Sequence, residues 1–67
     1  MTVERAHLTS SMCRQAEYDD EKQELTIWFN SGMPYTYGGV PKRVFEGLRD
    51  APSAGQYFHQ NIKNVYA

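Results

Sequence analysis

The order of hydrophobic and polar residues along the chain predicts a small sheet followed by two helices. The clearest strand covers residues 25–29, where Leu25, Ile27 and Phe29 alternate with residues of the opposite face. Strict alternation of this kind, rich in β-branched and aromatic residues, is typical of a strand with one buried face. We therefore expect this segment to be the central strand.

A second strand is predicted before it, over residues 12–18, where alternation is less regular and one side carries Met12, Arg14, Ala16 and Tyr18. The polar cluster 19–23 then favours a turn, because Asp side chains accept hydrogen bonds from the nearby backbone. Residues 1–7 have a weak pattern and form either an N-terminal arm or a short edge strand.

The segment Asn30-Ser31-Gly32 predicts a hairpin turn with two open registers. A three-residue loop with Gly32 in the left-handed conformation places Phe29 opposite Met33, Ile27 opposite Tyr35 and Leu25 opposite Tyr37. A two-residue loop instead pairs Tyr35 with Trp28 and Tyr37 with Thr26. We favour the first register because it leaves fewer polar groups in the core and puts both tyrosines on the buried face as half-buried residues.

Two helices should follow the Gly38-Gly39 exit from the sheet. Pro41 suits the start of a helix over about 41–50, and its apolar stripe is Val44, Phe45 and Leu48. Pro52 ends that helix, and Ser53 with Gln56 fits a capping box that begins a second helix at 54–65. The buried face of the second helix should carry Phe58, Ile62, Val65 and Tyr66, and Gly55 in its first turn suggests a close backbone approach.

These elements predict one α+β domain over residues 1–67: an antiparallel sheet of three strands, or four if residues 1–7 add an edge strand, with two C-terminal helices packed on one face. A chain of 67 residues buries a small core, so periodic apolar residues are expected to be structural. Ile27 and Phe45 should be central to that core.

Charge and cysteine content exclude several classes of function. The net charge is −1, and six of the eight carboxylates lie before Met33, so no strongly basic surface for nucleic acid is expected. The single cysteine, Cys13, and the distant His7 and His59 do not form a metal-binding or nucleophile-base pattern. We expect no metal, no cofactor and no enzymatic activity. The chain shows no signal peptide or membrane-spanning run, which predicts a cytoplasmic location.

Candidate partner contacts are aromatic or basic residues, namely Trp28, Tyr35, Tyr37, Lys42, Arg43, His59 and Lys63. Trp28 is the best candidate for an exposed contact, because the favoured register puts it on the face away from the helices. For the two tyrosines a core role is favoured over base stacking. Lys42 and Arg49 are expected to pair with Glu46 along the helix surface, which would neutralise part of the basic charge.

The motif Tyr35-Thr36-Tyr37, the following Val40-Pro41, and the segment 51–58 with Ile62 together resemble the KTSC family. Ser10-Ser11 and Tyr18-Asp19 match as well, so that the resemblance covers residues 8–63. This small domain is found alone in bacterial and phage proteins and at the C-terminus of some lysyl-tRNA synthetases. The resemblance implies no established activity, and it implies possible RNA binding through the synthetase context.

The expected function is therefore that of a small bacterial or phage adaptor or modulator that binds a protein partner, as a monomer or weak homodimer and without a membrane. The alternative is an RNA-binding accessory domain. Family members commonly carry Lys or Arg where this chain has Ala54, Gln56 and Gln60, and that departure weighs against RNA.

Overall fold

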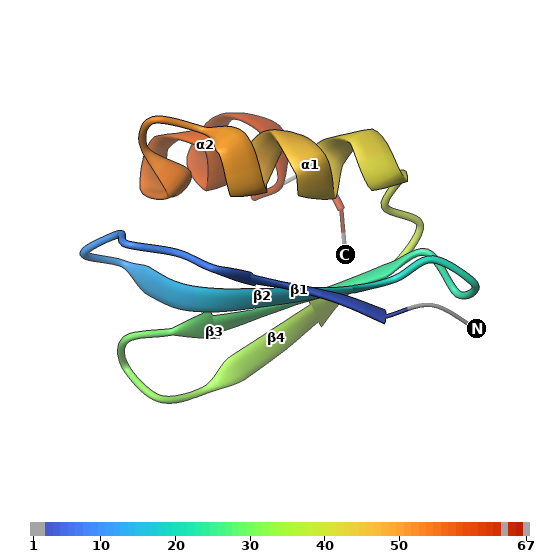
Figure 1. Cartoon of the computed structure of the whole chain (residues 1–67), viewed down its shortest axis with the longest axis horizontal. Coiled ribbons are helices and arrows are strands. Elements are labelled where there is room, and N and C mark those ends of the chain that lie inside the picture. Colours follow the sequence, from blue (N-terminus) through green and yellow to red (C-terminus); the bar gives the residue numbers. More distant parts are fainter. Residues whose placement is uncertain (1–2, 64, 67) are drawn as a thin grey trace.

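Four antiparallel strands in the order β1-β2-β3-β4 form one sheet, and both helices pack on the same side of it (Figure 1). This computed structural model describes residues 3–63, 65 and 66. The elements are β1 (Val3–His7), β2 (Cys13–Asp19), β3 (Glu24–Phe29), β4 (Pro34–Tyr37), α1 (Lys42–Asp50) and α2 (Ala54–Asn61). The predicted α+β class is confirmed.

The N-terminal segment is an edge strand, which makes four strands. β1 pairs with β2 in register, with Ala6 opposite Ala16. Met1 and Thr2 of the predicted arm lie outside the described residues. β1 is further attached to the helical layer, because Lys42 Nζ at the start of α1 lies 2.9 Å from Glu4 Oε2.

The hairpin between β3 and β4 has the favoured three-residue register. Leu25 lies opposite Tyr37 and Ile27 opposite Tyr35, and the amide of Gly32 donates to the carbonyl of Phe29 at 2.9 Å. Gly32 has a φ of 106°, a backbone conformation that favours glycine. On the outer face, the hydroxyls of Thr26 and Thr36 lie 2.9 Å apart and tie the two strands together.

Arg14 was expected on the same side of its strand as Ala16 and Tyr18, and this expectation was wrong. β2 contains a bulge between Cys13 and Gln15, which shifts the alternation by one residue. As a result Cys13, Ala16 and Tyr18 are buried, and Arg14 is exposed. An extra residue in one strand of a pair has this effect because successive side chains point to opposite faces.

The core lies between the sheet and the helices. Ile27 and Phe45 are fully buried, as predicted, and the rings of Tyr18 and Phe45 stack with centroids 5.5 Å apart. The Tyr18 hydroxyl donates to the carbonyl of Val40 at 2.6 Å. Because the amide of Val40 also donates to the carbonyl of Gln23 at 2.9 Å, this buried residue is held through both of its backbone polar groups.

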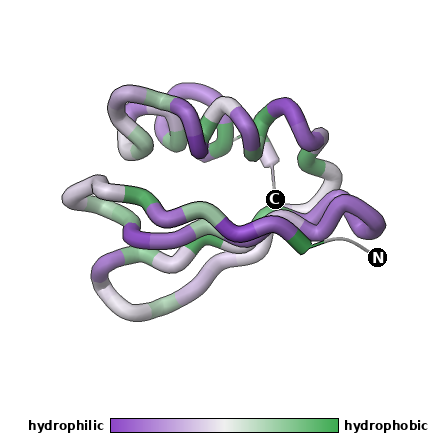
Figure 2. The backbone as a smooth tube through the Cα atoms, in the orientation of Figure 1, coloured by the Kyte–Doolittle hydropathy of each residue, from purple (hydrophilic) through white to green (hydrophobic). Residues whose placement is uncertain are grey.

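The hydropathy of the chain differs between the two ends of the molecule (Figure 2). The turn between β2 and β3 is strongly hydrophilic and lies at one end of the molecule. Asp19 organises that turn, as predicted, by accepting from the amides of Glu21 and Lys22 at 3.0 and 3.1 Å. The β1–β2 loop and the β3–β4 turn lie at the opposite end (Figure 1).

Both helices begin and end where their proline and serine signals suggested, except at the end of α2. Ser53 caps α2, its hydroxyl accepting from the amide of Gln56 at 3.3 Å. The expected extension to residue 65 was wrong, since α2 ends at Asn61 and Val65 is 60% exposed. The amides of Ile62 and Lys63 both donate to the carbonyl of Phe58, which closes the helix and turns the chain.

Two glycines let neighbouring elements approach closely. A Cβ atom on Gly47 of α1 would lie 2.1 Å from the Tyr57 hydroxyl oxygen and 2.5 Å from Cζ of the same ring, so α2 packs this ring directly on the α1 backbone. The approach expected at Gly55 is also present, with Ser10 Oγ 3.3 Å from the position of a Cβ there.

Candidate binding groove

A groove of about 470 Å³ opens between β4, the end of β3, the β1–β2 loop, and the C-terminal half of α2 with the residues that follow it. We call it the aromatic groove. It is lined by Ser11, Met12, Phe29, Asn30, Ser31, Tyr35, Tyr37, Phe58 and Lys63.

Strand alternation places its rings side by side. Phe29 ends β3, Tyr35 and Tyr37 alternate on β4, and Phe58 reaches them from α2. The rings meet edge to face in a continuous series: centroid distances are 5.7 Å for Tyr35–Phe29, 5.3 Å for Phe29–Phe58 and 5.9 Å for Phe58–Tyr37. Edge-to-face contacts are favourable and hold each ring in a defined orientation, so the groove wall is ordered.

The two tyrosines differ in burial. Tyr37 is half-buried, as expected, and burial raises the pKa of its hydroxyl, with Tyr35 adding a smaller effect in the same direction. Tyr35 was expected to be half-buried as well, but it is 59% exposed. Tyr35 lies opposite the buried Ile27 and contacts Phe29, so its ring is on the helix-facing side of β4. Because β4 is the edge strand farther from the helices (Figure 1), the ring remains open to a ligand.

The polar rim of the aromatic groove is partly fixed and partly free. Asn30 Nδ2 donates to the carbonyls of Ser10 and Ser11 at 3.1 and 2.8 Å, which attaches the β3–β4 turn to the β1–β2 loop. Lys63 is exposed on the opposite rim, and within residues 3–63, 65 and 66 no carboxylate pairs with it. No carboxylate of the described chain lines the groove.

The other predicted contact residues lie elsewhere. Trp28 is on the outer sheet face, as the register required, but it is only partly exposed, with Gln15 and Pro34 paired beside it. Arg43 is exposed on α1. His59 is exposed next to the groove, its ring 5.6 Å from that of Phe58.

The ion pairs expected with Glu46 were wrong. Lys42 pairs with Glu4 of β1, and this hydrogen bond raises the pKa of the Lys42 ammonium. Arg49 pairs with the adjacent Asp50 at 2.9 Å. Both partners are nearer than the helix neighbour because the fold brings β1 against α1 and because Asp50 ends the helix.

Sequence reasoning assigned Phe29 and Phe58 to the core and did not connect them with a binding surface. It also passed over Met12 and the polar rim. The available signal was the favoured hairpin register, which already placed Phe29 and Tyr35 on the same face of the sheet, with Ile27 opposite Tyr35.

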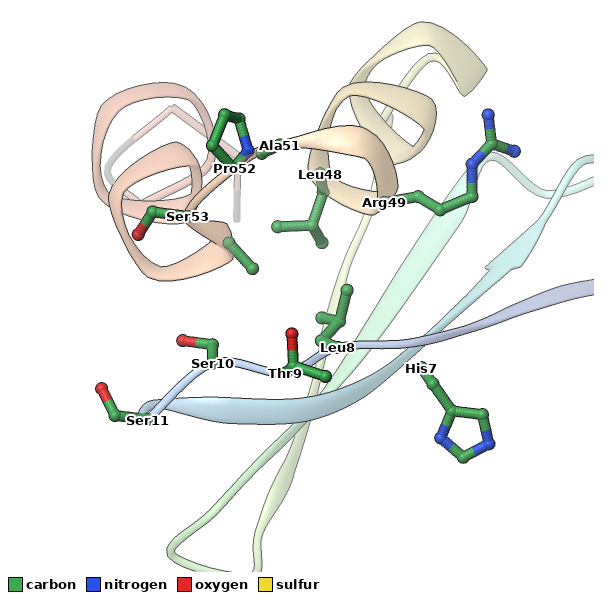
Figure 3. A pocket seen from close by; sticks show the side chains of 11 residues that line it. His7, Leu8, Thr9, Ser10, Ser11, Leu48, Arg49, Ala51, Pro52 and Ser53 are labelled. Carbon is green, nitrogen blue, oxygen red and sulfur yellow. The ribbon is translucent and has the colours of Figure 1, made fainter.

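A second, smaller cavity of about 220 Å³ lies between the β1–β2 loop and the junction of α1 and α2 (Figure 3). Its polar lining includes the hydroxyls of Thr9 and Ser10 from the β1–β2 loop and of Ser53 at the N-cap of α2. The guanidinium of Arg49 and the ring of His7 point away from these hydroxyls. The cavity therefore holds no convergent set of charged groups.

Reactive side chains do not gather in the described part of the chain. Cys13 is fully buried, and burial raises the pKa of its thiol. No group of three or more His, Cys, Asp or Glu residues is placed to hold a metal ion among the described residues. Neither described helix has the length and apolar character needed to cross a membrane.

A four-stranded antiparallel sheet with two helices on one face and an open aromatic groove beside the edge strand defines a small two-layer α+β domain. A family model, the KTSC domain, matches residues 9–66. The chain belongs to the KTSC domain family, as the resemblance indicated.

Similar proteins fall into two size classes. The chain is 45% identical to a lysine–tRNA ligase from Trichormus variabilis over 56 residues, which are 84% of this chain and 10% of that protein. It is 41% identical to a protein from Stutzerimonas stutzeri over 61 residues, 91% of this chain and 86% of that one. The chain thus spans about a tenth of the ligases it matches.

The fold agrees with a crystal structure of a KTSC domain protein from Yersinia pestis. The TM-score is 0.91 at 30% identity, and the match covers 98% of this chain and 93% of that chain.

Proposed function

We propose that this chain is a non-catalytic binding module that holds a short segment of a protein partner in the aromatic groove. The observation that carries the proposal is the exposed ring of Tyr35, which the fold leaves uncovered at the end of an ordered series of four rings. Exposed aromatic residues in an apolar depression with a polar rim are typical of the energetic centre of protein interfaces.

The reactive groups support a non-catalytic role. The thiol of Cys13 is buried and its pKa is raised, so little thiolate is present at neutral pH. His7 is on β1 and His59 is on α2, and the side chain that hydrogen-bonds with the Cys13 thiol is that of Ser10 rather than of either histidine. A nucleophile activated by a neighbouring base needs a contact with that base.

Single-stranded RNA is the second candidate. Lysine–tRNA ligases act on tRNA, and several relatives bear that name. Exposed tyrosines on a strand can stack with unpaired bases. Against this, Lys63 is the one basic residue that lines the groove in the described chain, whereas strong RNA binding uses several phosphate contacts.

The cytoplasmic location and the monomeric or weakly dimeric state remain predictions from the sequence. Pro34 begins the edge strand β4 and has no amide proton, which limits pairing of that edge with a second copy. A bacterial or phage source is consistent with the bacterial relatives.

The test is affinity capture from bacterial lysate, with and without ribonuclease, using three forms of the protein. Tyr35→Ala removes the exposed ring of the groove, and Trp28→Ala removes an aromatic residue of the opposite face as a matched control. We expect a discrete protein that survives ribonuclease, is lost with Tyr35→Ala and is retained with Trp28→Ala.

Two results would contradict the proposal. Loss of capture with Trp28→Ala alone, at unchanged circular dichroism, would move the binding surface to the outer sheet face. Submicromolar binding of hexauridylate near physiological salt, weakened by Tyr35→Ala, would favour RNA instead.

A further inference from the structure

We infer that the aromatic groove selects an extended peptide segment in which an aromatic or long aliphatic side chain stands next to a carboxylate. This inference rests on the proposed function and names the chemistry of the partner. It follows from two separate features of the groove, its apolar wall and the distribution of charge around it.

The wall specifies the apolar part of the ligand. Phe29, Tyr35, Tyr37 and Phe58 present ring edges and faces, and Met12 adds a flexible apolar side chain. Burial of a large apolar side chain against such a surface removes the most nonpolar area from water per residue of ligand. Met12 adapts to side chains of different shape because it has no branch.

The charge distribution specifies the second part. Lys63 stands on the groove rim, and no carboxylate of the described chain pairs with it or lines the groove. The acidic turn between Asp19 and Glu24 lies at the other end of the sheet (Figures 1 and 2). A ligand carboxylate beside Lys63 therefore meets a positive charge that no described carboxylate neutralises, and a ligand cation is repelled by that charge.

Recognition through side chains fits the edge strand better than strand addition. β4 has four residues and starts with Pro34, which cannot donate a backbone hydrogen bond. A partner strand added to this edge would lack a regular ladder, so the ligand's side chains must supply the affinity.

The test compares two blocked dipeptides that differ in one group, acetyl-Phe-Asp-amide and acetyl-Phe-Asn-amide. Each is titrated at millimolar concentration into isotope-labelled protein, and chemical-shift changes of backbone amides locate the site. We expect both to shift the amides of Phe29, Tyr35 and Phe58, with the Asp peptide binding about two- to fivefold more tightly, as for an exposed ion pair.

Two lysine variants separate a specific pair from overall charge. Lys63→Gln should abolish the advantage of the Asp peptide, whereas Lys22→Gln, on the exposed turn at the other end, should preserve it. The advantage in the parent protein should also shrink at high salt.

Each other outcome overturns the inference. Equal binding of the two peptides at the groove removes the carboxylate preference and leaves the proposed function standing. Absence of shifts at the groove rejects this ligand class, while loss of lysate capture with Tyr35→Ala would still support the broader proposal. Tighter binding of hexauridylate than of either peptide at the same amides assigns the groove to RNA.

Discussion

Removing one buried hydroxyl should measurably weaken the whole fold. In Tyr18→Phe the ring keeps its stacking on Phe45, and only the hydrogen bond to the carbonyl of Val40 is lost. Val40 is fully buried and no other described donor reaches that carbonyl. A buried acceptor left without a donor costs about 1–3 kcal/mol in free energy of unfolding.

That loss is a large fraction of the stability of a domain this small. Each kcal/mol should lower the melting temperature by about 4–8 °C. Urea titration followed by circular dichroism measures the free energy directly, and a thermal scan provides a second estimate. Tyr35→Phe is the matched control, because it removes a hydroxyl from an exposed ring.

A loss of less than about 0.5 kcal/mol in the free energy of unfolding of Tyr18→Phe would contradict this prediction, because that is the lower limit for a typical hydrogen bond. A loss equal to that of Tyr35→Phe would point the same way. Either result would mean that the carbonyl of Val40 finds another partner when the hydroxyl is absent.

Three further changes test the helices and the thiol. Gly47→Ala should destabilise the parent protein, because the new methyl group overlaps the Tyr57 ring. In a Tyr57→Ala background the same change should raise the free energy of unfolding by about 1 kcal/mol, because alanine has a higher helix propensity than glycine. If the effects of the two substitutions were simply additive in this double-mutant cycle, the contact between Gly47 and Tyr57 would be excluded. Phe45→Ala should cost on the order of 3–5 kcal/mol and unfold most of the protein, as seen in its amide spectrum. Burial raises the pKa of the Cys13 thiol in the folded protein, so the unfolded chain loses the thiol proton at a lower pH than the folded chain does. The free energy of unfolding should therefore fall as pH rises above about 8.5. Urea titrations in alkaline buffers should show a weaker fall in Cys13→Ala.

The sheet was predictable because its signals are local. Alternation located β3, and the preference for few polar groups in the core selected the hairpin register that the structure confirms. The Arg14 bulge was not predictable in the same way, because an extra residue in a strand depends on pairing with the neighbouring strand. The early end of α2 also lacks a local signal, since no glycine or proline follows Asn61. Where α2 ends, the next residue, Ile62, is fully buried in the core, and this tertiary packing is not visible in the sequence.

The candidate site could be predicted only in part. Tyr35, Tyr37 and Lys63 were identified as possible contacts, and the fold brings these three together. Their common surface depends on where the helices lie over the sheet, and apolar periodicity gives the buried face of a helix without its position. For the same reason the ion pair between Glu4 and Lys42 could not be foreseen, since its members are far apart in the sequence.

The double anchoring of Val40 has a consequence for how this domain tolerates change. The buried Val40 receives a hydrogen bond from Tyr18 and donates one to Gln23. These bonds fix the point where the chain enters the helical layer, and that point lies after the Gly38-Gly39 connection. Both glycines are exposed, and a Cβ at either position would meet no neighbouring atom within 4 Å, while the φ of 68° at Gly39 favours keeping glycine there. Lengthening a flexible surface loop costs little entropy. Inserted residues, or a grafted reporter sequence, between Gly38 and Gly39 should therefore leave the packing of sheet and helices intact.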